Sequence, residues 1–206
     1  MKRICSLPFT KMKKLKKYSE VGLLEDYKVI DDTIMTYKKF HEIEFSEKIN
    51  STSFDHCVFE NCIFKETIAN CTFYNVCFKN CECSNSLFNE CSFQAVLFES
   101  NHMVGTNLIN SRIGNTEFIG NHMKYINLAS NQMKNTSLKE NNLSNGTMFE
   151  VTLEEIELDG NDFSEMEVVH TDMKDIDITS CKINGIRISP ECVRGMIVDE
   201  VQAIEL

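Results

Sequence analysis

A large apolar residue returns at every fifth position through most of this chain. From Phe73 to Ile188 the series is interrupted by only one smaller member, Cys83. A helical period of 3.6 would carry such residues around the helix, and a strand period of two would alternate them between the faces of a sheet. Neither element by itself explains a spacing of five.

Two further classes of residue keep the same spacing. The position two before each apolar centre holds a smaller residue, as in Cys71, Val76 and Cys81. The position two after each centre is often Asn or Gly, which tolerate the positive φ of tight turns. These corner residues include Asn75, Asn80, Asn85, Gly105, Asn110, Asn115, Gly120, Asn135, Asn145, Gly160 and Gly185. The pattern predicts a chain that turns a corner after every five residues, with the first two classes pointing inward.

Four such sides would complete one coil, which predicts a second period of twenty. Asn101, Asn121, Asn141 and Asn161 recur at that spacing, and so do Phe78, Phe98 and Phe118. The sequence therefore predicts an all-β solenoid with four short sides per coil.

Single blocks of the repeat resemble those of the pentapeptide-repeat family. Examples are residues 57–61 (Cys-Val-Phe-Glu-Asn), 71–75 (Cys-Thr-Phe-Tyr-Asn) and 106–110 (Thr-Asn-Leu-Ile-Asn). The resemblance covers about two thirds of the chain, and many tandem copies carry it. It implies a right-handed quadrilateral β-helix of about seven coils.

The repeat divides the chain into three parts: a basic and amphipathic segment at 1–44, the β-helix at 45–190 and a C-terminal cap at 191–206. Phe54, Phe59 and Phe64 keep one register, and Ile68 onward keeps another that is displaced by one residue. One side near residues 65–69 is therefore one residue short. The phase does not slip after Ile68, which leaves no room for an inserted loop.

The N-terminal segment admits two interpretations. Leu23, Tyr27, Ile30, Ile34 and Tyr37 fall at helical spacing and predict an amphipathic helix. The alternative is irregular strand over 27–45 that leads into the first coil. The lysines at 11, 13, 14, 16 and 17 form a basic cluster, which is typical of a solvated arm or of a tag for an anionic surface.

The last residues suit a cap. A solenoid with an open end exposes unpaired backbone and core, so it needs one. The apolar residues available for it are Met196, Ile197, Val201, Ile204 and Leu206. This tail resembles that of the quinolone-resistance (Qnr-like) type within the family, and the resemblance implies a homodimer formed through this end.

The ten cysteines predict neither disulfides nor a metal site. Cys57, Cys62, Cys71, Cys81, Cys91 and Cys181 occupy the small inward position, where a free thiol acts as a small hydrophobic group. Their spacing contains no pair of zinc hooks. No apolar run suits a signal peptide or a membrane span. We therefore expect a cytoplasmic protein without cofactor or membrane contact.

No constellation for catalysis is evident, so we do not expect an enzyme. A general acid or base needs a pocket that shifts its pKa, whereas a stack one coil wide fills its own interior. Asn101, Asn121, Asn141 and Asn161 are inward polar residues, and their spacing predicts an amide ladder from coil to coil.

Charged residues are distributed unevenly along the chain. Residues 1–40 carry ten Lys and Arg against five Asp and Glu, whereas the whole chain carries 21 against 31. The acidic excess thus lies in the repeat. Glu99, Glu117, Glu157, Asp159 and Asp177 would flank one side, with Lys139 as an exception. Solubility explains such a surface. A sharper hypothesis is a rod of carboxylates that mimics the phosphates of DNA, so we expect no direct nucleic-acid binding by the repeat.

The Qnr-like resemblance implies a partner for such a surface, a type II topoisomerase (DNA gyrase or topoisomerase IV). The protein would modulate the enzyme or protect it from quinolones. The lack of inserted loops departs from several members of that type and favours plain inhibition of gyrase. An alternative is a structural or adaptor rod for another protein, with no topoisomerase contact.

A second surface is apolar. Ile109, Ala129, Phe149 and Val169 follow four successive centres at a spacing of twenty and would form a stripe, with Leu87 near its start. Aligned apolar patches usually mark a contact. The amphipathic face at 23–37 could cover it, and an outside partner is the alternative.

Overall fold

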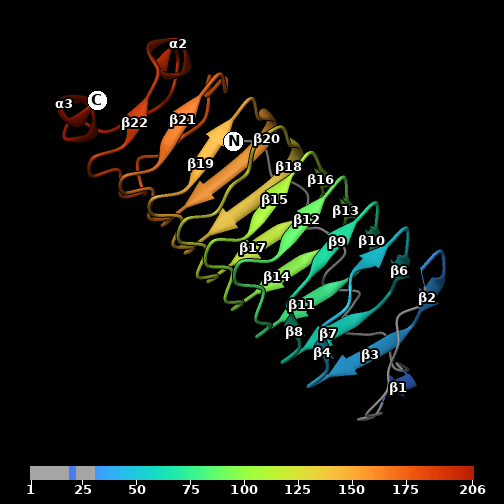
Figure 1. The fold of residues 1–206 in the computed structure, drawn as a ribbon. Helices are drawn as coiled ribbons and strands as arrows, with labels where there is room; N and C mark the ends of the chain where they lie inside the picture. The colour runs from blue at the N-terminus through green and yellow to red at the C-terminus, as the bar shows by residue number, and fades with distance from the viewer. Residues whose placement is uncertain (1–18, 22–30) are drawn as a thin grey trace.

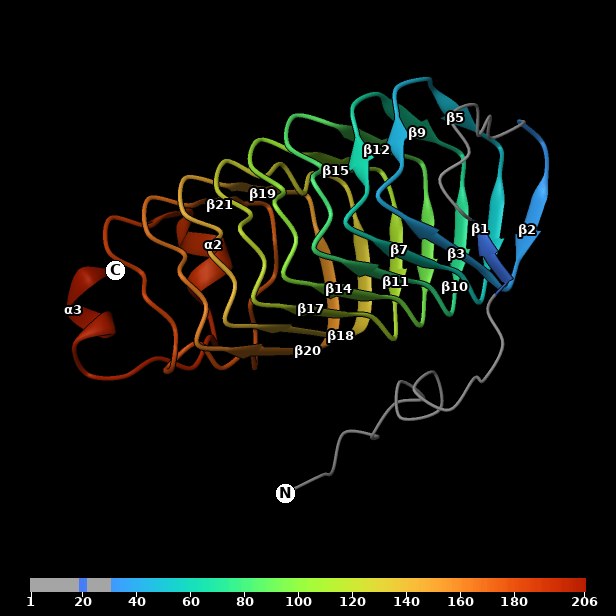
Figure 2. The same cartoon turned by 90° about the horizontal axis from the view of Figure 1, so that it is seen from below.

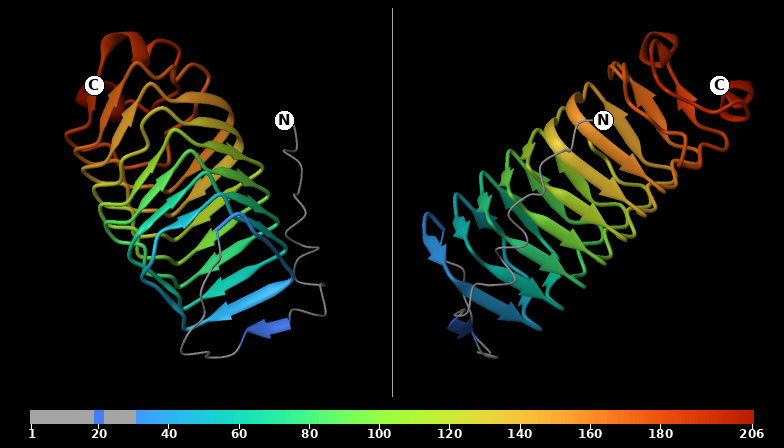
Figure 3. Two further views of the ribbon diagram at one scale, coloured as in Figure 1. Left: turned by 45° about the vertical axis from the view of Figure 1, so that its right-hand side comes forward. Right: turned by 180° about the vertical axis from the view of Figure 1, so that it is seen from behind.

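The protein is a four-sided parallel β-helix of about eight turns, seen in a computed structural model that describes residues 19–21 and 31–206. Figure 1 shows the coils stacked along one axis, with the helices α2 and α3 at the C-terminal end. Figures 2 and 3 show the same single file of coils from other directions. The predicted fold class is confirmed, with about one turn more than expected.

Each side of the β-helix is defined by its column of inward residues, and nearly all of these are buried. The columns of the first and second sides are Met35, Phe54, Phe73, Phe93, Ile113, Met133, Leu153, Met173 and Phe40, Phe59, Phe78, Phe98, Phe118, Leu138, Leu158, Ile178. Those of the third and fourth sides are Phe45, Phe64, Cys83, Met103, Met123, Leu143, Phe163, Ile183 and Ile49, Ile68, Phe88, Leu108, Leu128, Met148, Val168, Ile188.

Short parallel strands form the sides. The first side holds β2 (Ile34–Thr36), β6 (Ser53–Asp55), β10 (Thr72–Tyr74), β13 (Ser92–Gln94) and β16 (Arg112–Gly114). The second side holds β1 (Ser19–Val21), β3 (Lys38–His41), β7 (Val58–Glu60), β11 (Cys77–Lys79), β14 (Leu97–Glu99) and β17 (Glu117–Ile119). Two longer strands, β18 (Gln132–Lys139) and β20 (Thr152–Asp159), run across both sides and join them into one 13-stranded sheet.

The other two sides carry less strand. The fourth side holds β5 (Ile49–Asn50), β9 (Thr67–Ala69), β12 (Leu87–Asn89), β15 (Asn107–Ile109), β19 (Thr147–Phe149), β21 (Glu167–Val169) and β22 (Arg187–Ile188). The third side begins with β4 (Glu44–Phe45) and β8 (Ile63–Phe64) and continues as single bridges such as His102 to His122.

The register explains the phase shift in the sequence. Phe54 pairs with Phe73, nineteen residues ahead, whereas Phe73 pairs with Phe93, twenty ahead. The short side predicted near residues 65–69 is confirmed, since Phe64 and Ile68 are neighbouring centres only four residues apart. The same shortening occurs one coil earlier, between Phe45 and Ile49.

The helix predicted at the N-terminus is wrong for its last two residues. Ile34 lies in β2 and Tyr37 occupies a corner with φ 53°, and both are exposed. The inward residues here are Met35 and Phe40, which already follow the five-residue spacing. The coils therefore begin at β2, before the boundary at residue 45, and the interpretation as irregular strand fits this part. Leu23, Tyr27 and Ile30 lie outside the described residues.

Aromatic rings fill the N-terminal half of the core. In the second column, the rings of Phe78, Phe98 and Phe118 stack nearly parallel, with centroids 4.8 and 4.6 Å apart. This distance equals the spacing between paired strands, so each ring contacts its counterpart in the next coil. Beyond Phe118 the column continues with Leu138, Leu158 and Ile178, which are buried and line a small apolar cavity.

The corners adopt the conformation that the sequence predicted. Most residues two positions after a centre have positive φ, from Asn115 at 48° to Gly185 at 69°. Glutamates also occupy such corners, including Glu155 at 55°. A non-glycine residue in this region costs free energy, which the hydrogen-bonded coils on either side offset.

The C-terminal segment closes the last coil. It contains α2 (Pro190–Val193) and α3 (Gln202–Glu205). The buried side chain of Gln202 donates from Nε2 to the carbonyl oxygens of Ile178 (2.9 Å) and Cys181 (2.8 Å). Gln202 thus supplies a donor to two carbonyls of the last coil, of which that of Ile178 also accepts a turn bond from Cys181 N–H. No helix in the described ranges is long and apolar enough to cross a bilayer.

Candidate functional site

The five predicted acidic residues lie on the second side, in two rows. β14 carries Glu99, β17 carries Glu117, and β20 carries Glu157 and Asp159. Asp177 follows one coil later, where it bridges to Ile197. Register places Ser137 between Glu117 and Glu157, two coils apart in one row. The structure thus brings the predicted residues onto one surface, which we call the acidic side.

Lysines neutralise part of this surface. Lys79 Nζ lies 3.0 Å from Glu99 Oε2, and Lys139 Nζ lies 3.7 Å from Asp159 Oδ2. In the first coils Lys39 pairs with Glu60 at 3.0 Å, which lowers the pKa of that carboxyl. Exposed pairs of this kind contribute little to stability, but they remove net charge. The unpaired carboxylates therefore gather in the C-terminal half of the acidic side.

Two carboxyls on the acidic side have shifted pKa values of opposite sign. Glu117 is half-buried, and this burial raises its pKa, with a further rise from the charge of Glu157. Asp177 accepts hydrogen bonds from the backbone N–H (2.9 Å) and the hydroxyl (2.7 Å) of Thr179, which hold its pKa below the usual range. Asp177 is thus the more firmly charged of the two near neutral pH.

Three acidic residues at the neighbouring corner were not predicted as part of the site. Glu154 and Glu155 belong to β20, and Asp175 is the corner residue of the next coil. All three are exposed. The sequence did indicate an acidic surface here, because residues 150–177 contain eleven acidic residues and Lys174 as the one Lys or Arg. The acidic side therefore extends around the corner onto the first side.

The buried asparagines form the predicted amide ladder. Asn121 Nδ2 donates to the carbonyl of Phe98 (2.9 Å) and to Asn141 Oδ1 (2.9 Å), and Asn121 Oδ1 accepts from the backbone N–H and side chain of Asn101. The same bonds continue to Asn161. Each amide is satisfied inside the core, so these residues are structural.

The described cysteines are free thiols, and those with the clearest shifts are inert. Burial raises the pKa of Cys57 and Cys71 to about 11 and that of Cys77 and Cys91 to about 12. A thiol with such a pKa is neither a nucleophile nor a metal ligand near neutral pH. Within residues 19–21 and 31–206, no group of three or more His, Cys, Asp or Glu could hold a metal ion.

The apolar stripe lies on the fourth side. Ile109, Ala129, Phe149 and Val169 occupy equivalent positions in successive coils, and Phe149 pairs directly with Val169. Phe149 is the one member that is exposed, at 38%, and its ring lies edge-on to His170 at 5.6 Å. A contact made by this stripe stays a prediction.

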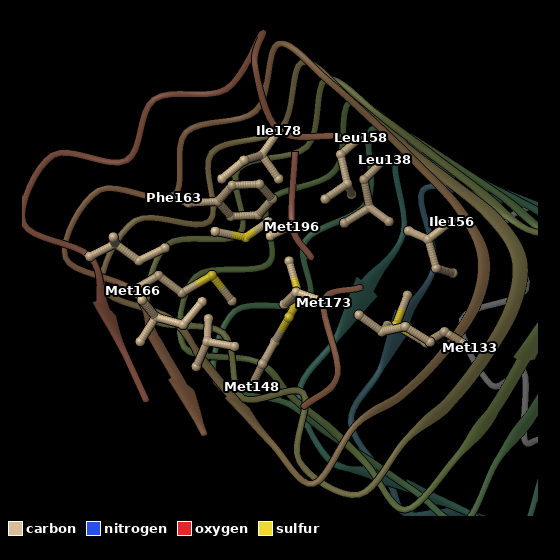
Figure 4. A pocket seen from close by; sticks show the side chains of 14 residues that line it. Met133, Leu138, Met148, Ile156, Leu158, Phe163, Met166, Met173, Ile178 and Met196 are labelled. Atoms are coloured by element: carbon tan, nitrogen blue, oxygen red, sulfur yellow. The ribbon is translucent and has the colours of Figure 1, made fainter. Parts of the chain in front are cut away.

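The C-terminal end presents four of the five predicted cap residues to solvent. Ile197, Val201, Ile204 and Leu206 are exposed, with Ile204 at 86%. Met196 instead points inward and lines a cavity in the core, as Figure 4 shows. It therefore covers the end of the core, whereas the other four form an outward apolar end. A dimer through this end stays a prediction.

Comparison with known proteins gives likeness of backbone only. No protein-family description and no curated protein matches the sequence. Among solved structures, full-length QnrB1, a plasmid-mediated fluoroquinolone resistance protein, is 12% identical over 81% of this chain and 96% of its own, with a TM-score of 0.34.

Two cyanobacterial pentapeptide-repeat proteins are similar to the same degree. HetL from Nostoc sp. strain PCC 7120, involved in regulating heterocyst differentiation, is 8% identical over 93% of this chain and 92% of its own (TM-score 0.43). Rfr23 from Cyanothece 51142 is 8% identical over 82% of this chain and 90% of its own (TM-score 0.32). At these values the likeness says nothing of a partner.

Proposed function

We propose that the protein is a non-enzymatic DNA mimic that binds a type II topoisomerase through its acidic side. The observation that supports this is the gathering of carboxylates in the C-terminal half of that side. Glu117, Glu157 and Asp177 stand in one row, and no lysine among the described residues pairs with them.

The dimensions suit a groove built for duplex DNA. Coils repeat at roughly 4.8 Å, so eight coils give a rod of roughly 38 Å, and the row from Glu117 to Asp177 spans roughly 14 Å of it. Duplex DNA presents one charge per roughly 1.7 Å of axis. The rod has fewer charges than DNA, but they lie on a straight, narrow body. The sequence resemblance to the Qnr-like type points to the same class of enzyme.

The test is a titration of gyrase supercoiling with the protein. We expect the wild type to inhibit supercoiling at a concentration that rises with salt, because association between charged surfaces is screened. Reversing Glu117, Glu157 and Asp177 to Lys should raise that concentration by about tenfold or more and flatten its salt dependence.

A matched control separates the surface from total charge. Glu82, Glu150 and Glu167 are exposed and lie away from the acidic side. Their reversal to Lys changes the net charge by the same amount, and we expect it to leave inhibition unchanged. Equal loss in the two variants, or no inhibition by the wild type, would contradict the proposal.

The adaptor rod is the second candidate, and the apolar stripe supports it. Phe149 and its neighbours on the fourth side offer an apolar contact surface. If Phe149→Ser abolishes binding to a cellular protein while gyrase is unaffected by the wild type, the adaptor function holds instead.

A further inference from the structure

The coil stack is split on two of its four sides, between β20 and residues 172–179 of the last coil. β20 pairs with β18 on one edge, and no bridge joins its other edge to the last coil in the described residues. The third and fourth sides remain bonded at the same level, for example from Phe163 N–H to Lys182 O (2.8 Å) and from Arg187 N–H to Met166 O (2.8 Å).

The missing hydrogen bonds can be named from the coils above. There, Asn115 N–H donates to Lys134 O (3.1 Å) and Ser137 N–H donates to Thr116 O (3.0 Å). Two coils later, the equivalent groups are the N–H of Glu155 and the carbonyl of Ile156. Neither has a protein partner across the split among the residues that the structure describes. β20 thus presents a free strand edge inside a continuous stack.

The hydrogen bonding at the corners changes across the split. The last coil closes its first two corners with turn bonds, from Ile176 N–H to Met173 O (3.1 Å) and from Cys181 N–H to Ile178 O (2.8 Å). β20 is instead one continuous strand that pairs with β18 on both sides of its corner, although Glu155 at that corner has a positive φ of 55°, as Asp175 has at 61°.

Apolar side chains are accessible through the split. Leu153 and Ile156 point inward from β20 but are only partly buried, unlike their partners Met133 and Thr136 one coil earlier. They line an apolar cavity of about 20 Å³ together with Met173, Ile178 and Met196. Figure 4 shows Ile156 and Met173 among the side chains that surround it.

The rim of the split is strongly acidic. Its carboxylates are Glu154, Glu155, Glu157 and Asp159 on β20 and Asp172, Asp175 and Asp177 on the last coil. The last coil adds Lys174, and the coil above adds Lys134 and Lys139, which pair with Glu154 (2.5 Å) and Asp159. A segment that binds here meets net negative charge.

We propose that this split is a docking site for an extended, basic strand of a partner protein. The strand would pair its backbone with the free edge of β20, which is strand addition. Alternate apolar side chains would contact Leu153 and Ile156, and lysine or arginine side chains would face the rim. This proposal does not depend on the topoisomerase.

Room for the strand comes from movement of the last coil. Residues 172–179 are bonded to the cap, through Ile178 N–H to Ile197 O (3.0 Å) and through Gln202, and not to β20. The last coil and the cap can therefore swing together about the bonded third and fourth sides. An added strand needs roughly 4.8 Å on each edge. Opening loses side-chain packing and the two bonds that flank β20, from Val151 N–H to Thr171 Oγ1 (3.2 Å) and from Gly160 N–H to Ser180 Oγ (3.1 Å).

The test uses the full chain and a defined probe, a blocked seven-residue peptide of alternating Lys and Val. Amide hydrogen exchange, followed by mass spectrometry, reads out protection along the chain. We expect the peptide to slow exchange in the fragment that covers β20 by about tenfold or more and to leave the fragment that covers β17 unchanged. The control peptide has the same charge but N-methyl groups on alternate amides, so it cannot pair, and it should give no protection.

A pair of matched variants tests the rim. Glu154→Gln with Glu157→Gln should weaken peptide binding about tenfold, whereas Glu82→Gln with Glu167→Gln should leave it unchanged. Equal protection by both peptides would show binding by charge alone and overturn the proposal. Protection of β20 in the absence of peptide would also overturn it. If that protection is lost on dilution, a second copy of the chain occupies the edge; if it is lost on removal of residues 1–18, the chain's own segment does.

Discussion

Phe118 and Glu117 are adjacent residues with opposite surroundings. Phe118 is 1% exposed and stacks on Phe98, whereas Glu117 points outward from the same strand. Replacing Phe118 by Ala should lower the free energy of unfolding by about 3–5 kcal/mol, because it leaves a cavity in a column of rings. Glu117→Ala should change it by no more than about 0.5 kcal/mol. Urea unfolding of both variants measures the difference, and equal sensitivity would refute the register.

Glu117 also gives the second side a defined pH response. Its pKa is raised above the ordinary value of 4.5 by burial and by Glu157. The charged carboxylate therefore costs the folded state free energy, a cost that is absent below the unfolded pKa and appears as pH rises through the folded pKa. Glu117→Gln should unfold at higher urea than the wild type at pH 7, and the two should converge near pH 3. A gap that persists at pH 3 would assign the effect to packing instead.

At the scale of the element, the asparagine ladder links five coils through buried amides. Asn121→Ala would leave the N–H of Asn101 without its acceptor. It would also remove one donor from the carbonyl of Phe98 and one from Asn141 Oδ1, which keeps the backbone N–H of residue 121. Each buried group left without a partner costs about 1–3 kcal/mol, so unfolding should require markedly less urea. Asn107→Ala, which loses one half-buried bond to Asn127, serves as the control and should cost about 1 kcal/mol or less. Similar losses in both would mean that the ladder adds nothing beyond surface amides.

The sequence predicts those features in which the type of a residue determines whether its side chain points inward or outward. The inward columns, the ladder and the acidic side all follow from counting fives and twenties, since burial of Phe98 or Asn121 is visible in residue type. The helix at Ile34 and Tyr37 failed because apolar residues at an outward and a corner position imitated a helical face. Met35 and Phe40 carried the true period there.

The split below β20 could not be predicted from residue type. Residues 153–158 and 173–178 share the same inward pattern of Leu or Met, Ile, and Leu or Ile. What differs is the hydrogen bonding at the corner, since β20 is one continuous strand paired with β18, whereas the last coil has a turn bond from Ile176 N–H to Met173 O. Asp and Glu are accepted at either corner, so the sequence contains no clear sign of the change. The same holds for the lysine pairs at Glu99 and Asp159, which depend on register between coils.

For the whole molecule, the coil is the unit of construction, because each coil contacts only its neighbours. Deleting residues 101–120 removes one full coil and joins Ser100 to Asn121 in the position that Gly120 held. We expect this variant to remain folded and to unfold cooperatively at lower urea. Deleting residues 101–118 removes two residues fewer, breaks the five-residue phase and should abolish the β-helix. Circular dichroism during urea unfolding distinguishes the two, and equal behaviour would show that phase does not govern the fold.

The free edge of β20 also decides how the rod responds to force along its axis. Above it, all four sides carry backbone bonds or bridges between coils, so tension is shared around the whole cross-section. At the split, among the described residues, backbone bonds and bridges between coils are confined to the third and fourth sides, which therefore carry the load. A load applied off-centre in this way concentrates on the few backbone hydrogen bonds nearest the opening, and these bonds break one after another. Under tension the protein should part first below β20, releasing the last coil and its cap while the coils filled with phenylalanine stay intact.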